Sequence, residues 1–281
     1  MTEQYAIECR QITKAFGSVV ANDKIDLTVR YGEIMALLGE NGSGKTTLMN
    51  MLSGIYHPDA GSILVGGKEV SINSPVDSRN LGIGMIHQHF KLVDVFSAMD
   101  NIVLGTKGKR LGRKALREKI EALGQSFGLE IEPEKKVYDM SVSEKQTVEI
   151  LKVLYRGAQI LILDEPTAGQ DYRHYTEIME FLKHLNETLG ITIIMITHDM
   201  HLMLEYTDRA IVIADGELIA DDKPAKVLTN EAVADRAYLK KTSLYDLAVR
   251  CGIEDASGFA ERFIYYERQV RADGRQNSDV Q

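Results

Sequence analysis

The most informative segment of the chain reads Gly39-Glu40-Asn41-Gly42-Ser43-Gly44-Lys45-Thr46-Thr47. An apolar run at residues 34–38 precedes it and a helical pattern at residues 48–52 follows it, which predicts a strand, a glycine loop and a helix N-terminus. In that context the spacing is typical of a loop whose backbone N–H groups surround phosphate oxygens at the positive end of a helix dipole. Lys45 is expected to reach the β- and γ-phosphates, and Thr46 to offer its hydroxyl to Mg²⁺. A tight turn with an exposed lysine is the alternative, but the segment predicts a nucleoside triphosphate site.

Composition narrows the class of protein. A chain of 281 residues with 44% hydrophobic and 26% charged residues suits one α/β domain, with or without an appendage. The net charge of −8 argues against a nucleic-acid-binding surface. Cys9 and Cys251 match no metal or redox spacing, so a reduced, cytosolic setting is the simplest interpretation. The longest apolar run, about six residues, is shorter than a membrane span. We expect no signal peptide at the start of the chain.

The segment before the loop predicts a pair of strands. Residues 5–29 alternate polar and apolar positions, which indicates two antiparallel strands with a turn at Phe16-Gly17-Ser18. The ring of Phe16 is placed to stack on a nucleotide base, although an aromatic residue beside a turn more often serves packing. Further on, Gly66-Gly67 is expected to close a second hairpin.

Two later strands end in polar residues. Residues 160–163 are all Ile or Leu and lead directly into Asp164 and Glu165. α/β folds place metal-binding and acid–base groups at such strand ends, so Asp164 is expected to orient Mg²⁺ and Glu165 to accept a proton from the attacking water. A surface acidic turn is the alternative. The strand at residues 191–196 leads to His198, which is expected to reach a γ-phosphate unless it is a satisfied histidine.

Residues 83–90 are expected to form a strand that ends in polar side chains, among them His87, Gln88 and His89. A metal site at the two histidines is the less favoured interpretation, because no cysteine or carboxylate lies close by in sequence.

The middle of the chain predicts helices. An amphipathic pattern recurs at i, i+4, i+7 and i+11, and its apolar positions are Leu116, Ile120, Leu123 and Phe127. A capping box, Ser141-Val142-Ser143-Glu144, is expected to begin a later helix. Beyond residue 223 the chain is helical and polar. A narrow apolar stripe in this last part is expected to pack on the body of the protein, and its members are Phe259, Phe263, Tyr266 and Val270.

Together, the motifs resemble the ATP-binding subunit of an ABC transporter over nearly all of residues 5–222. The resemblance implies an α/β fold, a P-loop NTPase with a RecA-like core and an antiparallel β subdomain. It also implies a nucleotide-binding domain at 1–222 with an inserted helical subdomain at about 90–157, and a helical extension at 223–281. The residues that match the family's site are the adenine-stacking Phe16, the Walker A residues Gly39, Asn41, Gly42, Ser43, Gly44, Lys45, Thr46 and Thr47, the glutamine-loop Gln88, the Walker B acids Asp164 and Glu165, Asp171 of the D-loop and the switch His198. Catalysis would then involve Lys45, Gln88, Glu165 and His198, and Mg²⁺ would be held by Thr46, Gln88 and Asp164.

The signature motif departs from the family pattern. The family usually has Leu-Ser-Gly-Gly-Gln, and this chain has Met140-Ser141-Val142-Ser143-Glu144. Family members dimerise so that the signature of one chain contacts ATP bound by the other, a role that Ser141 would take in trans. Val142 and Ser143 add Cβ atoms where glycine allows close approach, and Glu144 adds a negative charge. Weak hydrolysis, or pairing with a chain whose signature is intact, is therefore an open alternative.

By resemblance, the chain is a Mg²⁺-dependent ATPase at the inner face of the cell membrane that powers import. Its partners would be a second ATPase subunit, identical or different, and transmembrane permease subunits, with no nucleic acid. The alternative is an ATP-binding, dimerising subunit that hydrolyses little. Residues 84–90 and 148–157 resemble nucleoside and simple-sugar importers, whereas residues 168–172 and 197–203 resemble energy-coupling-factor vitamin importers. This contrast suggests the hypothesis of a mosaic, natural or engineered, with its seam near Asp164.

Overall fold

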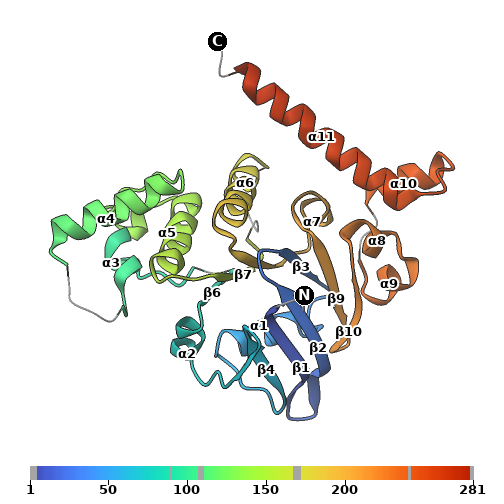
Figure 1. Ribbon diagram of the computed structural model, residues 1–281, viewed down its shortest axis with the longest axis horizontal. Helices are drawn as coiled ribbons and strands as arrows, with labels where there is room; N and C mark the ends of the chain where they lie inside the picture. The colour runs from blue at the N-terminus through green and yellow to red at the C-terminus, as the bar shows by residue number, and fades with distance from the viewer. Residues whose placement is uncertain (1–4, 89, 107–110, 167–171, 240–241, 279–281) are drawn as a thin grey trace.

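The computed structural model describes residues 5–88, 90–106, 111–166, 172–239 and 242–278. Two β-sheets form its centre (Figure 1). The first sheet is antiparallel in the order β2-β1-β4-β5, and its strands are β1 (Tyr5–Phe16), β2 (Val19–Arg30), β4 (Ala60–Val65) and β5 (Lys68–Val70). Both predicted hairpins are present, because Phe16 pairs with Val19 and Val65 pairs with Lys68.

The second sheet positions the site. Its order is β10-β9-β3-β8-β7-β6, and every neighbouring pair is parallel except β9 with β10. The strands are β3 (Ile34–Leu38), β6 (Ile83–Ile86), β7 (Ile160–Asp164), β8 (Thr192–Ile196), β9 (Arg209–Ala214) and β10 (Glu217–Asp222). The parallel strands are apolar runs because both faces of this sheet are covered. Their carboxyl ends meet at one edge, which is where an α/β fold places its ligand.

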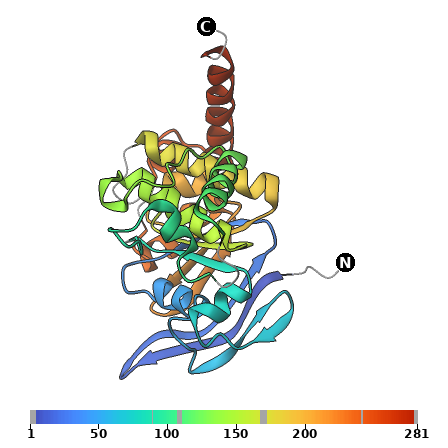
Figure 2. The same cartoon turned by 90° about the vertical axis from the view of Figure 1, so that its left-hand side faces the viewer.

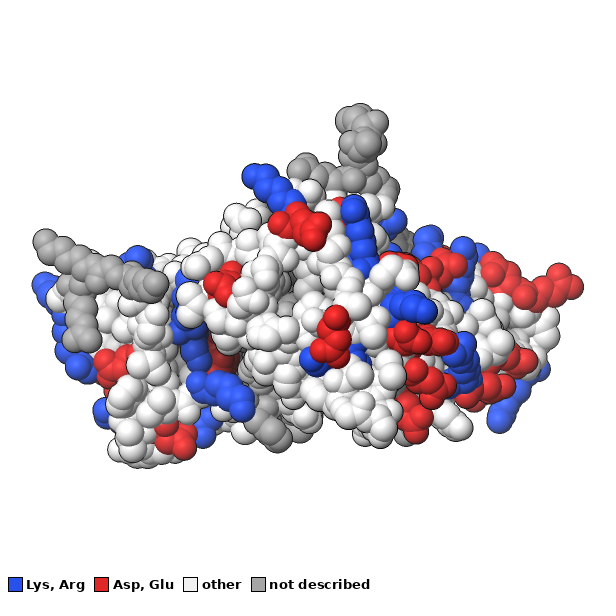
Figure 3. Space-filling model, turned by 90° about the horizontal axis from the view of Figure 1, so that it is seen from below, with Lys and Arg blue, Asp and Glu red and all other residues white. Residues whose placement is uncertain are grey.

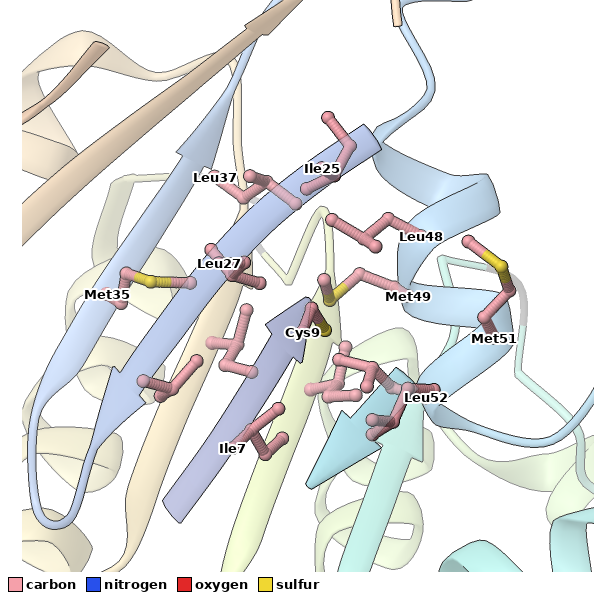
Figure 4. Packing of buried hydrophobic residues seen from close by; sticks show 14 of the residues in the cluster. Ile7, Cys9, Ile25, Leu27, Met35, Leu37, Leu48, Met49, Met51 and Leu52 are labelled. Carbon is pink, nitrogen blue, oxygen red and sulfur yellow. The ribbon is translucent and has the colours of Figure 1, made fainter. Parts of the chain in front are cut away.

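Helix α1 (Lys45–Leu52) lies between the two sheets. Its side chains Leu48, Met49 and Leu52 are buried against Leu27 of the antiparallel sheet and Leu37 of the parallel one (Figure 4). Burying each side chain of this size contributes about 1.5–3 kcal/mol relative to exposure. This packing fixes the start of α1, and with it Lys45, against the sheet.

Other helices cover the opposite face and the flanks of the parallel sheet. Helices α6 (Tyr172–Leu189) and α7 (Met200–Tyr206) pack on the far face. Helices α8 (Pro224–Thr229) and α9 (Glu231–Arg236) pack on β9 through Val227, Leu228 and Val233. Helix α2 (Pro75–Asn80) precedes β6. The domain boundary at residues 222 and 223 stays a prediction.

A helical subdomain lies to one side of the sheets (Figures 1 and 2). It consists of α3 (Ala98–Val103), α4 (Arg113–Ser126), the short 3₁₀ helix η1 (Val137–Asp139) and α5 (Val142–Tyr155). Its separate apolar core contains Ile120, with Leu116, Leu123 and Phe127 packed around it, as the amphipathic pattern predicts. The predicted fold class, an α/β P-loop core with an antiparallel subdomain and a helical insertion, is confirmed.

The C-terminal part corrects one prediction. Helices α10 (Ser243–Arg250) and α11 (Ala256–Ser278) follow the core, and α11 extends away from it (Figure 1). Most of the apolar stripe does not pack on the body, because Phe263, Tyr266 and Val270 are 43%, 69% and 54% exposed, whereas Phe259 is half-buried. Ala260 and Ile264 are buried instead. They are four residues apart on another face of the helix, and their small or aliphatic side chains allow the close approach that large rings prevent. None of the helices that the structure describes combines the length and hydropathy of a membrane span.

Candidate functional site

The glycine loop joins β3 to α1 at the carboxyl edge of the parallel sheet. A Cβ on Gly39 would lie 2.0 Å from the carbonyl oxygen of Ile213, and one on Gly44 would lie 2.1 Å from that of Ala21. Both residues also have positive φ, +143° and +106°. Only glycine therefore fits at either position, and the loop is held between β9 and β2.

Lys45 turns back over the loop. Its Nζ donates to the carbonyl oxygens of Gly39 and Glu40, both at 2.8 Å, and the residue is buried. Burial lowers the pKa of Lys45, while the nearby carboxylates of Glu165 and Asp164 act in the opposite direction. Lys45 is thus a buried cation that donates its hydrogen bonds to neutral carbonyls. It lies at the carboxyl edge of the parallel sheet, near the carboxylates of Asp164 and Glu165.

The rest of the loop offers polar groups. Ser43 Oγ is buried and makes no hydrogen bond within the described part of the chain. A buried hydroxyl without a partner is costly, and a phosphate oxygen would satisfy it. Asn41 and Thr46 are exposed, as is Gly42, while Thr47 is half-buried.

Three neighbouring strands bring the acids and the histidine to the loop. In the sheet, β8 lies between β3 and β7, so His198, which follows β8, stands between Lys45 and the two acids at the end of β7. His198 Nε2 lies 3.1 Å from Glu165 Oε1. At this distance the two side chains are in contact, and they form an ion pair only when His198 is protonated, the form that its lowered pKa disfavours. Glu165 Oε1 has no hydrogen-bond partner among the described residues.

The surroundings of these groups shift their pKa values. Burial raises the pKa of Asp164 and Glu165, and for Glu165 the neighbouring Asp164 adds to this effect. Burial and then the charge of Lys45 lower the pKa of His198. Glu165 also has φ of +49°, a left-handed conformation that is rare for residues other than glycine. A raised pKa suits a carboxylate that takes up a proton near neutral pH, and strained backbone often accompanies function.

Gln88 lies at the same edge. It follows β6, the strand next to β7, and its side chain is exposed. Burial lowers the pKa of the adjacent His87, and His89 lies outside the described residues. Within the described ranges, no cluster of three or more His, Cys, Asp or Glu side chains is arranged to hold a metal ion. Thr46, Gln88 and Asp164 present oxygen donors instead, the class that Mg²⁺ prefers.

Phe16 ends β1, and its ring is 44% exposed. The ring packs edge-on against Tyr56 with centroids 5.2 Å apart, and Lys14 Nζ lies 5.5 Å from its centroid. One side of the ring is therefore used for packing while much of its surface remains available for a base. Asp171 lies outside the described residues.

The altered signature forms the start of α5. Ser141 is the N-cap, and its Oγ accepts from the N–H of Glu144 while Glu144 accepts from the N–H of Ser141. Lys135 Nζ donates to Glu144 at 2.5 Å, and this hydrogen bond lowers the pKa of the Glu144 carboxyl. The carboxylate of Glu144 in the signature is therefore paired with Lys135 and also accepts a hydrogen bond from the backbone N–H of Ser141 at the start of the helix.

Two site-supporting residues escaped the sequence reasoning. Asn22, fully buried on β2, donates from Nδ2 to the carbonyl oxygen of Gly44 at 3.2 Å. Gln146 on α5 donates from Nε2 to the carbonyl oxygen of Pro166, next to Glu165, at 2.7 Å. A signal was present for Gln146, because it stands four residues before the buried Ile150 and so is a polar residue on an apolar helix face.

Comparisons with known proteins identify the family. The family model "ABC transporter" matches residues 22–168. The nucleoside import ATP-binding protein NupA of Lactococcus lactis is 47% identical over 238 residues, 84% of this chain and 47% of NupA. The guanosine import ATP-binding protein NupO of Bacillus subtilis is 49% identical over 217 residues, 76% of this chain and 42% of NupO. The chain thus spans about half the length of these curated relatives.

Solved structures agree with this result. The structure of cbiO1 from Clostridium perfringens, part of the ABC transporter complex cbiONQ, covers 89% of this chain and 100% of its own, with a TM-score of 0.72 and 29% identity. A dimeric post-hydrolysis structure of the ATP-binding cassette MJ0796, bound to ADP and Pi, covers 78% and 98%, with a TM-score of 0.67 and 25% identity. The glycine loop, the acids that follow β7 and these relatives lead to one conclusion: the chain belongs to the ABC transporter family, as an ATP-binding cassette.

Proposed function

We propose that this chain hydrolyses ATP at the interface of a cassette dimer and thereby drives import through membrane subunits. One observation carries the proposal, the meeting of Lys45, Glu165 and His198 at the ends of three adjacent parallel strands. A buried cation, a carboxylate with a raised pKa and a histidine beside it are what in-line phosphoryl transfer to water requires.

Some of the site residues would bind ATP, and others would take part in its hydrolysis. Phe16 would stack on the base, and the loop N–H groups with the buried Ser43 hydroxyl would bind phosphate oxygens. Lys45 would exchange its two carbonyl acceptors for β- and γ-phosphate oxygens. Glu165 would take a proton from water as the water oxygen bonds to the γ-phosphorus and the bond to the ADP oxygen breaks. His198 would then stabilise charge on the γ-phosphoryl group.

The donor set fits a magnesium ion. Asp164 is half-buried, and burial alone disfavours its charged form, so a cation held near it would offset that cost. Thr46 and Gln88 would complete the protein's share of the ligands. When bound, the ion neutralises charge on the β- and γ-phosphate oxygens.

A second cassette would complete the site, because Ser141 acts on the partner's ATP. Ser141 and Val142 are exposed at the start of α5, and Ser141 can still donate its hydroxyl proton while its oxygen accepts within the capping box. The dimeric MJ0796 structure, which contains ADP and Pi, supports this arrangement.

Glu165→Gln tests the proposal. The amide keeps the size of the side chain but cannot accept the proton, so steady-state turnover should fall by at least 100-fold, or about 2.7 kcal/mol. ATP binding should persist, and an ATP-dependent dimer should accumulate in size-exclusion chromatography. Near wild-type turnover in this variant would refute the assignment of Glu165 as the base.

A second candidate function, ATP binding with little hydrolysis, is favoured by the signature. Val142, at the first helical position of α5, presents an exposed branched side chain where the family has glycine. The test compares turnover of the purified protein with that of a Val142→Gly/Ser143→Gly variant. A large gain in the variant supports the second candidate, whereas equal turnover supports the first.

The relatives support a proposal for the partners and the substrate. That cbiO1 is part of the ABC transporter complex cbiONQ supports further transporter subunits as partners of this chain. We propose that these are membrane permease subunits and that the chain works at the inner face of the membrane. NupA and NupO make nucleosides the first substrate class to assay, by uptake of labelled guanosine in cells with and without the chain. The mosaic hypothesis stays a hypothesis, and separate alignment of the two halves would test it.

A further inference from the structure

Asn22 is a polar side chain in an apolar part of the core. It lies on β2, whose other three buried residues are Ile25, Leu27 and Val29. On the face of the molecule in Figure 3, acidic and basic side chains both stand at the surface, whereas Asn22 is 0% exposed. A fully enclosed side chain cannot contact a nucleotide directly. Any effect of Asn22 on the site must therefore act through the residues that it holds.

The hydrogen-bonding capacity of the Asn22 amide is only partly used. Its Nδ2 donates to the carbonyl oxygen of Gly44 at 3.2 Å, but its Oδ1 is buried and has no hydrogen-bond partner within the part of the chain that the structure describes. A buried acceptor without a partner lowers the stability of the fold. A leucine has the same number of heavy atoms in the same branched arrangement and would carry no such cost. Fold stability alone therefore does not account for an asparagine at this position.

A second hydrogen bond holds the neighbouring carbonyl of the phosphate loop. The N–H of Gly216, in the turn between β9 and β10, donates to the carbonyl oxygen of Ser43 at 3.2 Å. The N–H of Asp23 on β2 donates in turn to the carbonyl oxygen of Gly216 at 2.8 Å. A Cβ on Gly44 or on Gly216 would lie 2.1 or 3.1 Å from the same atom, the carbonyl oxygen of Ala21. Two consecutive loop carbonyls are thus held from one side, the side of β2.

The direction of these carbonyls sets the direction of the next two N–H groups. A peptide unit is planar, and the described peptide bonds are trans, so the N–H of each unit points away from its own carbonyl. The carbonyl of Ser43 shares a unit with the N–H of Gly44, and the carbonyl of Gly44 shares one with the N–H of Lys45. Both N–H groups therefore point away from β2. Neither donates a hydrogen bond to any other described residue, so both are available to an anion.

The start of α1 does not depend on Asn22. The carbonyl oxygen of Gly44 also accepts from the N–H of Leu48 at 2.9 Å, which is the first hydrogen bond of the helix. A carbonyl oxygen has two lone pairs, so it can accept from both donors. Removing the Asn22 donor would leave this oxygen bonded to Leu48, and only the hold from β2 would be lost. A substitution at Asn22 can therefore separate the geometry of the loop from the stability of the fold.

We propose that Asn22 is a positioning residue for nucleotide binding. Together with the Gly216 N–H, it holds the loop so that the N–H groups of Gly44 and Lys45 are already aimed at phosphate oxygens. The inference rests on the proposed function, because it assigns a further residue to the same site. The ligand class is nucleoside di- and triphosphates, since N–H groups of such a loop contact the α- and β-phosphates, which both ligands contain. Donors that are fixed in advance lose less conformational entropy when the ligand binds.

The test is Asn22→Leu in the full chain, with ATP and ADP affinities measured by titration calorimetry in the presence of Mg²⁺. Leucine keeps the branched shape and removes the donor. Both affinities should fall about fivefold, which corresponds to about 1 kcal/mol, the usual contribution of one neutral hydrogen bond. The melting temperature of the nucleotide-free variant should equal or exceed that of wild type, because the unpartnered Oδ1 is removed.

Asn101→Leu is the matched control. Asn101 is also 0% exposed, but it lies on α3 in the helical subdomain. Its side chain accepts from the N–H of Val93 at 2.8 Å and donates to the carbonyl oxygens of Val93 and Ser97 at 3.1 and 3.0 Å. Losing these bonds should lower the melting temperature, while both nucleotide affinities stay within about twofold of wild type because the site is distant. The two variants should thus give opposite results in the two measurements.

Amide resonances report on the two N–H groups directly. In wild type labelled with ¹⁵N-glycine and ¹⁵N-lysine, the amide signals of Gly44 and Lys45 should shift on saturation with ADP, and they should shift less in Asn22→Leu. Signals that do not respond to ADP in wild type, or wild-type affinity in Asn22→Leu, would overturn the proposal. A lower melting temperature combined with weaker binding in Asn22→Leu would also overturn it, because Asn22 would then have a structural role.

The remaining outcomes separate this inference from the proposed function. If wild type binds ATP and ADP with the expected dependence on Asn22 but hydrolyses no ATP, the proposed hydrolysis is wrong and the role of Asn22 stands. If wild type binds neither nucleotide, both proposals are wrong.

Discussion

Glu149→Ala is expected to release the segment that follows Gln88 from helix α5. The Glu149 carboxylate accepts from the backbone N–H of Lys91 at 2.9 Å, and Lys152 Nζ donates to the carbonyl oxygen of the same residue, also at 2.9 Å. The two side chains pair with each other at 3.2 Å and are 5% and 12% exposed. The ion pair between Glu149 and Lys152 on α5 therefore binds both the backbone N–H and the backbone carbonyl of Lys91, three residues beyond Gln88.

The size of the effect follows from this burial. Removing one partner of a buried ion pair costs about 3–5 kcal/mol. The lower end applies here, about 3 kcal/mol, because Lys152 keeps the carbonyl oxygen of Lys91 and its charge is not left without a partner. Glu149→Gln keeps an oxygen that can accept from the N–H of Lys91, so a smaller loss of about 1–2 kcal/mol is expected.

Hydrogen exchange at the Lys91 amide measures this directly. A loss of about 3 kcal/mol corresponds to exchange roughly 100-fold faster in Glu149→Ala, with a smaller change in Glu149→Gln. The matched control is Glu121→Ala, which breaks an exposed pair with Arg117 at 2.8 Å and should leave exchange at Lys91 unchanged. If hydrogen exchange at the Lys91 amide in Glu149→Ala stays within threefold of wild type, the Glu149 carboxylate does not hold this segment in place.

Three further predictions follow. Gly44→Ala should abolish ATP binding, because its Cβ would lie 2.1 Å from a backbone oxygen, whereas Gly112→Ala, with open space around it and a negative φ, should bind normally; similar losses would contradict this. A thiol reagent should label only Cys251 before unfolding, since burial raises the pKa of Cys9 to about 12; two labelled thiols in the mass spectrum would contradict this. Gln146→Ala should lower kcat about tenfold with ATP affinity unchanged, because a buried hydrogen bond is worth about 1–3 kcal/mol; weaker ATP binding at normal kcat would refute it.

The core of the fold was predictable because its signals are local. The apolar runs that become β3 and β7, and the glycine pattern between β3 and α1, each fix a strand or a turn within about ten residues. Parallel strands then bring their carboxyl ends together, so the positions of Lys45, Glu165 and His198 relative to one another follow from topology.

Contacts that depend on packing were not predictable. The pairing of Glu144 with Lys135 joins α5 to the segment before η1, and nothing in the charge pattern indicates which lysine is used. The face of α11 that packs inward carries Ala260 and Ile264, whose side chains allow close approach to the body of the protein. The sequence pattern instead predicts that the larger aromatic side chains pack inward. Arg79 and Arg156 are far apart in sequence, and no pattern in either segment indicates that they share a cavity.

Helix α5 connects the altered signature to the residues around Glu165. At one end Ser141 caps the helix and Gln146 donates to the carbonyl oxygen of Pro166, next to Glu165. At the other end Arg156, the C-cap, donates to the carbonyl oxygen of Leu104. Fourteen helical residues span about 21 Å, and hydrogen bonds along the whole length make such a rod stiff. Any displacement of Arg156 along the helix axis must therefore move Ser141 or strain the Gln146 contact. Glu144 closes the capping box that fixes the first turn, so this residue of the altered signature also holds in place the helix end that carries Ser141.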